Sequence, residues 1–456
     1  MIQEEINMKV KKIYASSFAK LDSSVLVGGG TDETARFQAV LDEAGDEVGI
    51  HLIMDGAALV TQLKLYSNTT IECLNKDCGF YQVAQTNNCL ITTGIWDYHE
   101  IKTRNIQLLG GTYHQNGQNQ EHDNPHVVHT TKRDLKNEFN KHYVHGIEFY
   151  GVENVLIRDV TVRDFRCYAI MVGCFKNVTI DQVWLDLPYG TKGNQDGFHF
   201  WGPGQFLTVL NSGGQVGDDI INVGPDEGDK FSSITDVLID GIFVNDGEQA
   251  VRLLSRGTGR LDRVTIRNVS GSYRSYGFYI DPWFVDSDLG NFGNIFIENV
   301  DLQAMKNTYE YHPPVLFSIG GNIECLTLKN IRHHNSYDNR TLIEIGLPFY
   351  DTHPERYHHY EMPGEQKIQN IIIDGLTVTE QPGEPENTDY IVVHDKIETM
   401  VLKNVLVLKN QEENGTLLKL APKGEIGTLI AESIHTKGLK TVIANEEQSG
   451  FAATAP

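Results

Sequence analysis

The stretch Asn154-Val-Leu-Ile-Arg-Asp-Val-Thr-Val162 carries apolar side chains at every second position on either side of Arg158-Asp159. Related segments of the general form N-[VI]-x-[IL]-x-[ND]-[VIG]-x-[VL] recur about every 22 to 32 residues where no loop intervenes. They lie at 68–73, 105–109, 177–185, 206–210, 236–244, 263–269, 294–302, 325–331, 370–378, 400–407 and 428–434. Alternation with period two predicts strands that have one apolar face. Because no helical pattern separates the segments, the repeat predicts stacked coils and disfavours a doubly wound sheet or a (β/α)8 barrel.

We therefore expect an all-β protein, a right-handed parallel β-helix solenoid of about 11 or 12 coils that forms a single domain over residues 1–456. Asparagine and aspartate at the strand edges suit tight bends, because both tolerate left-handed backbone geometry. Two polar stretches rich in histidine or tyrosine, 111–146 and 333–368, interrupt the period. We expect them to be long loops that flank a groove.

Residues 28–60 contain the one strong helical pattern of the chain. Thr31 or Asp32 is expected to cap a short N-terminal helix. The apolar face of this helix has helical spacing and consists of Phe37, Val40, Leu41 and Ala44. A solenoid needs a cap over its first coil, and this short capping helix is expected to supply it.

The composition limits the class of partner. Hydrophobic residues make up 40% of the chain and charged residues 22%, which is typical of a folded protein. The formal net charge of −23 makes nucleic acid and anionic membranes poor partners. No run approaches the roughly 18 apolar residues of a membrane span. The acidic N-terminus does not resemble a signal peptide, so we expect a cytoplasmic protein unless a leader has been removed. The six cysteines show no CxxC spacing, and we expect reduced, mostly buried thiols.

Acidic residues gather in two nearby stretches, Asn194–Pro203 and Gly217–Asp219. A spacing similar to the repeat places Asp196 and Asp218 on neighbouring coils, whose strands lie about 4.8 Å apart. Carboxylates this close cannot all ionise freely, so at least one pKa rises and a protonated acid lies beside an ionised base. Hydrolysis of a glycosidic bond needs this pair of groups. Flanking glycines leave room for a sugar chain, and nearby aromatic residues offer stacking surfaces. The alternative is that these acids only form bends.

The combination of Asn-x-Asp-Gly and Gly-Asp-Asp one coil apart resembles the polygalacturonase-type glycoside hydrolases, family 28, over about residues 28–300. The resemblance implies that Asp196 and Asp218 hold the attacking water as general base and that Asp219 is the general acid. It also implies an inverting reaction on pectic chains, with no metal and no cofactor.

The next two coils depart from the family pattern. Where the family has Gly-His-Gly, this chain has Asp246-Gly-Glu-Gln-Ala-Val-Arg252, and Arg-Ile-Lys is replaced by Tyr279-Ile-Asp281. The basic groups that grip a uronate are absent there, so we expect a neutral or sparsely charged plant or microbial glycan in place of plain polygalacturonate. Arg252 and Arg256 could still bind an isolated acidic group. The candidate substrate-binding residues are His199, Trp201, Glu248, Arg252, Tyr279 and Asp281.

Two other functions stay open at this point. A polysaccharide lyase, epimerase or sugar transferase could use the same scaffold, and a lyase would need calcium on the carboxylates and a base such as Arg252. A tailspike-like β-helix would bind glycans without turnover. The histidines of 111–146 lack a compact ligand spacing, so zinc is not expected. The oligomeric state is not predicted.

Overall fold

The computed structural model describes residues 8–121, 123–128, 141–282, 288–306, 314–335, 341–346, 365–380, 389–409, 415–439 and 441–445. The chain divides into two compact units, 1–218 and 219–456, and the boundary is the peptide bond between Asp218 and Asp219. The single domain over 1–456 stays a prediction. In the stretch 111–146, expected to be a long loop, the described residues 111–121, 123–128 and 141–146 contain three short strands and a 3-10 turn. Most of the loop expected at 333–368 lies outside the described residues, and the groove that the two loops were expected to flank stays a prediction.

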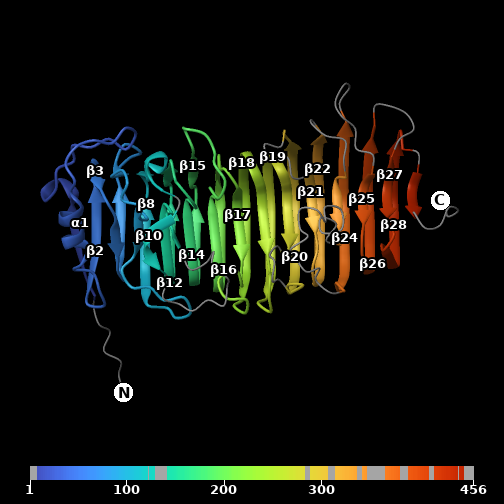
Figure 1. The fold of residues 1–456 in the computed structure, drawn as a ribbon, viewed down its shortest axis with the longest axis horizontal. Coiled ribbons are helices and arrows are strands. Elements are labelled where there is room, and N and C mark those ends of the chain that lie inside the picture. The colour runs from blue at the N-terminus through green and yellow to red at the C-terminus, as the bar shows by residue number, and fades with distance from the viewer. Residues whose placement is uncertain are drawn as a thin grey trace, which may run out of the picture. The chain divides into compact units, whose positions relative to one another are not determined.

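The regular structure of the first unit is mainly strands, most of which are stacked side by side (Figure 1). Its helical segments are α1 (Thr34–Leu41) and the 3-10 turns η1 (Ala15–Ser17) and η2 (Gly117–Asn119). Its strands are β1 (Lys9–Tyr14), β2 (Val48–Met54), β3 (Ala57–Val60), β4 (Leu63–Leu65), β5 (Thr69–Cys73), β6 (Gly79–Gln82), β7 (Ile91–Thr93), β8 (Thr103–Leu109), β9 (Thr112–His114), β10 (Asp123–Val128), β11 (Lys141–Tyr143), β12 (Ile147–Arg158), β13 (Thr161–Arg163), β14 (Ile170–Asp181), β15 (Trp184–Asp186) and β16 (Phe198–Gly214).

The second unit repeats the pattern with longer strands and has no helix among its described residues. Its strands are β17 (Asp219–Gly224), β18 (Ile234–Leu254), β19 (Leu261–Asp281), β20 (Phe292–Ala304), β21 (Val315–Ile319), β22 (Ile323–Asn335), β23 (Ile343–Ile345), β24 (Ile368–Glu380), β25 (Asp389–Val393), β26 (Lys396–Leu408), β27 (Thr416–Leu420), β28 (Glu425–Lys437) and β29 (Thr441–Asn445).

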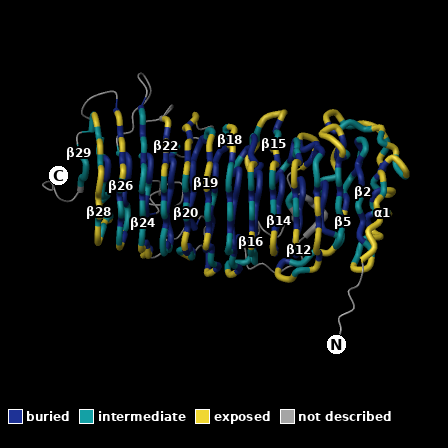
Figure 2. Tube along the Cα trace, turned by 180° about the vertical axis from the view of Figure 1, so that it is seen from behind, coloured by how far each residue is buried: buried dark blue, intermediate teal, exposed yellow. Residues whose placement is uncertain are grey.

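Aliphatic columns form the core of each unit. Strands on successive coils pair in parallel, so equivalent side chains lie one above the other. In the first unit one such buried column is Leu52, Ile71, Leu108, Ile157, Ile180 and Val209. In the second unit it is Ile239, Ile266, Ile297, Leu328, Ile373 and Leu402. Figure 2 shows the buried positions along the strands of each stack. The predicted all-β, right-handed parallel β-helix is confirmed, and each predicted repeat segment lies in a strand or overlaps one.

Asparagines at the bends bond to one another along the stack. Asn154 and Asn177 have left-handed backbones, with φ of 58° and 57°. The Nδ2 of Asn177 donates to Oδ1 of Asn154 (2.8 Å), and the Nδ2 of Asn154 donates to Oδ1 of Asn105 (3.2 Å). In the second unit Asn330 donates to Asn299 and Asn299 to Asn268. The expected role of asparagine in these bends is confirmed.

The N-terminal helix is confirmed, but two details of its prediction are wrong. Helix α1 ends at Leu41, because the backbone turns and the N–H of Gly45 donates to the carbonyl of Val48 at the start of β2. Ala44 therefore lies outside the helix. The N-cap position is Glu33, although the Asp32 carboxylate accepts from the N–H of Thr34 (3.0 Å). Phe37 and Leu41 are the buried residues of the helix.

All six cysteines are free thiols, and five of them are buried, as predicted. No helix in the described part of the chain is long and apolar enough to cross a membrane.

Candidate functional site

The backbone of the first unit brings Asp196 and Asp218 together. The carbonyl of Asp196 accepts from the N–H of Ala169 on the preceding coil (2.8 Å). On the following coil, the N–H groups of Gly217 and Asp218 both donate to the carbonyl of Gln195, at 3.0 and 3.2 Å. The two aspartates are therefore on neighbouring coils, as their spacing predicts.

Gly217 allows this close approach. A Cβ at this position would lie 1.9 Å from the carbonyl oxygen of Lys192, which no side chain permits. The Asp218 carboxylate then accepts from the N–H of Asn194 (3.1 Å). Glycine before the Asp-Asp pair is thus a requirement of the backbone packing.

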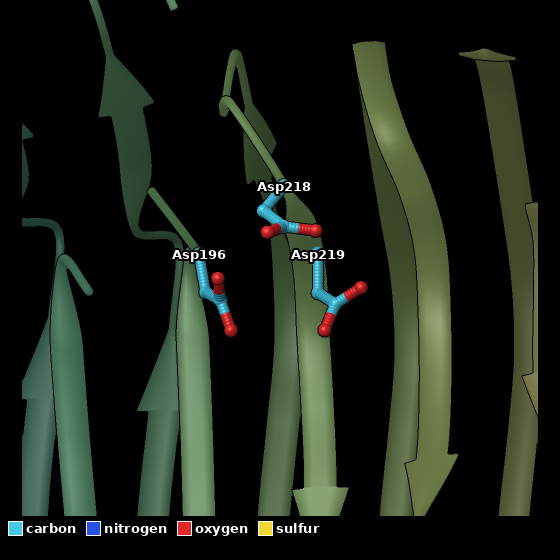
Figure 3. A group of neighbouring side chains, drawn as sticks. All are labelled: Asp196, Asp218 and Asp219. Atoms are coloured by element: carbon cyan, nitrogen blue, oxygen red, sulfur yellow. The ribbon is translucent and has the colours of Figure 1, made fainter. Parts of the chain in front are cut away.

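Asp219 is the residue after Asp218 and completes a cluster of three acidic side chains. One carboxylate oxygen from each of Asp196, Asp218 and Asp219 lies within 4.8 Å of the others (Figure 3). Asp196 and Asp219 are buried, whereas Asp218 is partly exposed. Water therefore has access to the group at Asp218.

His199 and Trp201 lie beside Asp196 on β16. His199 Nδ1 lies 2.7 Å from Asp196 Oδ2, and the indole N–H of Trp201 donates to His199 Nε2 at 2.9 Å. The rings of His199 and Tyr168 stack, with centroids 4.0 Å apart and planes at 8°. Both His199 and Trp201 are buried, and their predicted contacts with substrate stay a prediction.

Within the second unit, polar side chains of β17 and β18 lie beside Asp219. Asn222 Nδ2 donates to Asp219 Oδ2 (3.2 Å), and Arg252 Nη1 lies 3.7 Å from the same oxygen. Arg252 reaches Asp219 because Asn222 and Arg252 are paired residues on β17 and β18. Arg252 was among the predicted residues, whereas Asn222 was not, and the only sequence signal for Asn222 is its position three residues after Asp219.

The predicted candidates Arg252 and Tyr279 also lie together. They are paired residues on β18 and β19, and the guanidinium carbon of Arg252 lies 5.3 Å from the centroid of the Tyr279 ring. Tyr279 stacks in turn on Tyr276, with centroids 4.2 Å apart. The aromatic ring attracts the cation and orients it.

Glu248 contacts residues of the next strand. Its carboxylate accepts from the hydroxyl of Ser275, and Arg274 Nε lies 3.4 Å from its second oxygen. The side chains of Glu248 and Arg274 are both buried, so they form a buried ion pair. Arg274, which also lies 3.8 Å from Asp246, was not among the predicted residues.

Asp281 ends β19 as a buried carboxyl group. Burial raises the pKa of Asp281 to about 8, and the nearby Arg252 opposes part of this rise. Arg256 lies near a second buried acid, since its N–H donates to Asp226 Oδ1 (2.9 Å). Burial raises the pKa of Asp226 to about 6, although hydrogen bonds from the N–H groups of Arg256 and Gly257 oppose the rise.

The three aspartates are also close enough to share one divalent cation. Acidic groups of this kind are common without an ion, and we assign none to them. Among the described residues no other group of histidine, cysteine and acidic side chains has this spacing. His114, from the histidine-rich stretch, is buried and stacks on Tyr81, and burial together with Arg163 lowers its pKa to about 3. It is therefore a neutral packing residue.

Known proteins resemble this chain over part of the sequence and over most of the fold. No family model matches. A polygalacturonase from Medicago sativa is 26% identical over 172 residues, which are 36% of this chain and 39% of that protein. This chain therefore spans about two fifths of the length of that relative.

Two solved structures share the fold. An exopolygalacturonase from Thermotoga maritima has a TM-score of 0.53 at 14% identity and covers 92% of each chain. A family 28 exopolygalacturonase from Yersinia enterocolitica has a TM-score of 0.51 at 14% identity and covers 94% of this chain and 79% of its own. The resemblance to polygalacturonase-type glycoside hydrolases is confirmed.

Proposed function

We propose that the protein hydrolyses a glycosidic bond in a plant- or microbe-derived oligo- or polysaccharide, with Asp196, Asp218 and Asp219 as its catalytic residues. One observation carries the proposal. The three carboxylates that match the motifs of the resembled family have oxygens within 4.8 Å of one another, and the partly exposed Asp218 opens them to water.

Three acids at this distance favour a mixed protonation state. Since like charges repel strongly in a buried site, one carboxyl retains its proton while a neighbour is ionised. In the proposed reaction Asp196 and Asp218 hold a water molecule and accept its proton as its oxygen attacks the anomeric carbon. The glycosidic C–O bond breaks, and Asp219 gives its proton to the departing oxygen.

The inverting course of the reaction comes from the family resemblance. The 4.8 Å limit between single oxygens is shorter than the about 6.5–9.5 Å between carboxyl groups of most inverting enzymes. The anomer of the first product tests the stereochemistry directly.

The expected substrate is a neutral or sparsely charged glycan. Arg252 already lies beside Asp219 and Tyr279, and Arg274 lies beside Glu248. The positions where the resembled family binds a uronate carry Tyr279 and Asp281 here, and Arg252 and Arg274 each lie beside an acidic side chain of this protein. A formal net charge of −23 adds long-range repulsion of polyanions.

The test is a panel of neutral and acidic oligosaccharides, with the anomer of each product followed by NMR. Asp219→Asn should lower kcat about 10²- to 10⁴-fold, because it removes the proton donor. Asp301→Asn, at a half-exposed position of β20, is the matched control and should keep full activity. Wild-type turnover by Asp219→Asn would refute the role of Asp219.

The same panel of oligosaccharides separates elimination from hydrolysis when ultraviolet absorption and the effect of a chelator are also measured. An unsaturated product that absorbs in the ultraviolet, together with loss of activity in a chelator, would identify a lyase that uses a cation on the carboxylates. Hydrolysis predicts neither result.

A further inference from the structure

Three buried side chains of the first unit form a hydrogen-bonded series that ends at a proposed catalytic group. Trp201, His199 and Asp196 are 4%, 1% and 3% exposed. The series runs from Trp201 Nε1 to His199 Nε2 (2.9 Å) and from His199 Nδ1 to Asp196 Oδ2 (2.7 Å). All three residues come from β16 and the turn before it, so the series is local in the sequence.

The chemistry of the indole decides the tautomer of the histidine. An indole N–H only donates, so His199 Nε2 must accept and cannot carry a proton. A neutral imidazole has one N–H, which leaves the proton on Nδ1. His199 therefore donates to Asp196, and a donor to a carboxylate favours its ionised form.

Packing holds the imidazole ring in this orientation. The Tyr168 ring covers one face of His199 at 4.0 Å, and His145 stacks on the other face of Tyr168 at 4.5 Å. A flip of the His199 ring would exchange its nitrogens for carbons and break both hydrogen bonds. The stacked rings come from successive coils, so the backbone pairing of these coils sets the spacing between the rings.

We propose that His199 is a positioning residue, which Trp201 holds in the Nδ1–H tautomer so that His199 fixes the orientation and ionised state of Asp196. The catalytic consequence rests on the proposed function, because it requires Asp196 to act as a base. The competing role for His199 and Trp201 is direct contact with the sugar. That role requires at least one of the two hydrogen bonds to break, because they occupy both ring nitrogens.

The tautomer can be measured without any substrate. In the full-length protein with ¹⁵N-labelled histidine, two-bond ¹H–¹⁵N NMR spectra distinguish Nδ1–H from Nε2–H and from imidazolium, and the His199→Asn spectrum assigns the signal. We expect Nδ1–H in the wild type and loss of this preference in Trp201→Phe, which removes the donor but keeps an aromatic ring. An Nε2–H tautomer or an imidazolium in the wild type would overturn the proposal.

Two amide variants test the consequence for turnover. In His199→Asn the side-chain amide nitrogen takes the place of Nδ1 and can still donate to Asp196, whereas His199→Gln places its amide near the position of Nε2. We expect His199→Gln to lower kcat about 10²-fold with little change in KM. The kcat of His199→Asn should be at least about tenfold higher than that of His199→Gln. Circular dichroism melts show whether each variant folds.

These results separate the two proposals. Equal losses in both variants, or a change confined to KM, would overturn the positioning role and favour sugar contact. If the folded wild type turns over no glycan of the panel, the proposed function fails, while the NMR spectra still decide the tautomer. If neither variant folds, the wild-type and Trp201→Phe spectra still decide it.

Discussion

Asp281, at the end of β19, is a strongly perturbed carboxyl group of the second unit. Burial raises its pKa to about 8, since the side chain is 2% exposed, and Arg252 lowers it only in part. An acid whose pKa is higher in the folded state than in the unfolded chain binds its proton more tightly when folded. The buried Asp281 carboxyl group therefore destabilises the folded state most at high pH.

We predict that Asp281 lowers the free energy of unfolding progressively as the pH rises from about 4 to about 8. Below this window both states hold the proton, and within it the free energy of unfolding falls by up to about 1.4 kcal/mol per pH unit. Asp281→Asn should remove this pH dependence, so the variant gains stability relative to wild type as the pH rises. Urea unfolding at about pH 5 and about pH 8 measures the difference.

The control for this prediction is Glu398→Gln, which neutralises an exposed acid of β26 in the same unit. Its stability should follow the wild-type pH dependence. An identical pH dependence in Asp281→Asn and wild type would show that the Asp281 carboxyl group is ionised in the folded protein over this range.

At the scale of single residues, the sequence was sufficient to place backbone positions but not side-chain contacts. Asp196 and Asp218 were predicted on neighbouring coils, because one repeat length separates them. The bonds from Trp201 to His199 and from Asn222 to Asp219 were missed, since they depend on rotamers that no repeat length encodes.

At the scale of the elements, the asparagines of successive bends form a ladder of side-chain hydrogen bonds, which we call the asparagine ladder (Asn105, Asn154 and Asn177 in the first unit). Each position combines a left-handed backbone with a side-chain hydrogen bond. Asn177 has φ of 57° and donates to Asn154 at 2.8 Å. We predict that Asn177→Ala lowers the free energy of unfolding by about 1–2 kcal/mol, because alanine is strained in the left-handed region and loses the bond. Asn177→Gly should cost less, because glycine adopts this backbone freely.

Urea unfolding of both variants measures the two parts of this effect. The difference between alanine and glycine reports the backbone strain, and the remaining loss in glycine reports the hydrogen bond, offset by glycine's greater freedom in the unfolded chain. Equal stability of Asn177→Ala and wild type would show that the ladder does not stabilise this bend.

The same ladder explains why element boundaries were harder to predict than elements. The repeat begins at Asn154, but β12 begins at Ile147, because the chain passes through the left-handed asparagine without leaving the parallel pairing. Helix α1 is likewise shorter than its apolar pattern. Pairing of β2, which starts at Val48, requires the chain to turn before Ala44 can extend the helix.

At the scale of the whole molecule, the formal net charge of −23 sets the long-range field that a substrate meets. This field repels a polyanion and leaves a neutral glycan unaffected, and salt screens it over a Debye length of about 20 Å at about 0.02 M and about 7 Å at about 0.2 M. Charge and sugar identity can be separated with one oligogalacturonate and its fully methyl-esterified form, which differ mainly in charge.

We predict a higher kcat/KM for the methyl ester than for the free acid, if either is a substrate of the proposed hydrolysis. Raising the salt concentration from about 0.02 M to about 0.2 M should increase kcat/KM for the acid and leave the ester nearly unchanged, because only the acid approaches against the field. Initial rates of reducing-end release measure both values. A kcat/KM for the acid that falls with salt would mean that local basic groups such as Arg252 outweigh the net charge, and the preference for neutral glycans would then be wrong.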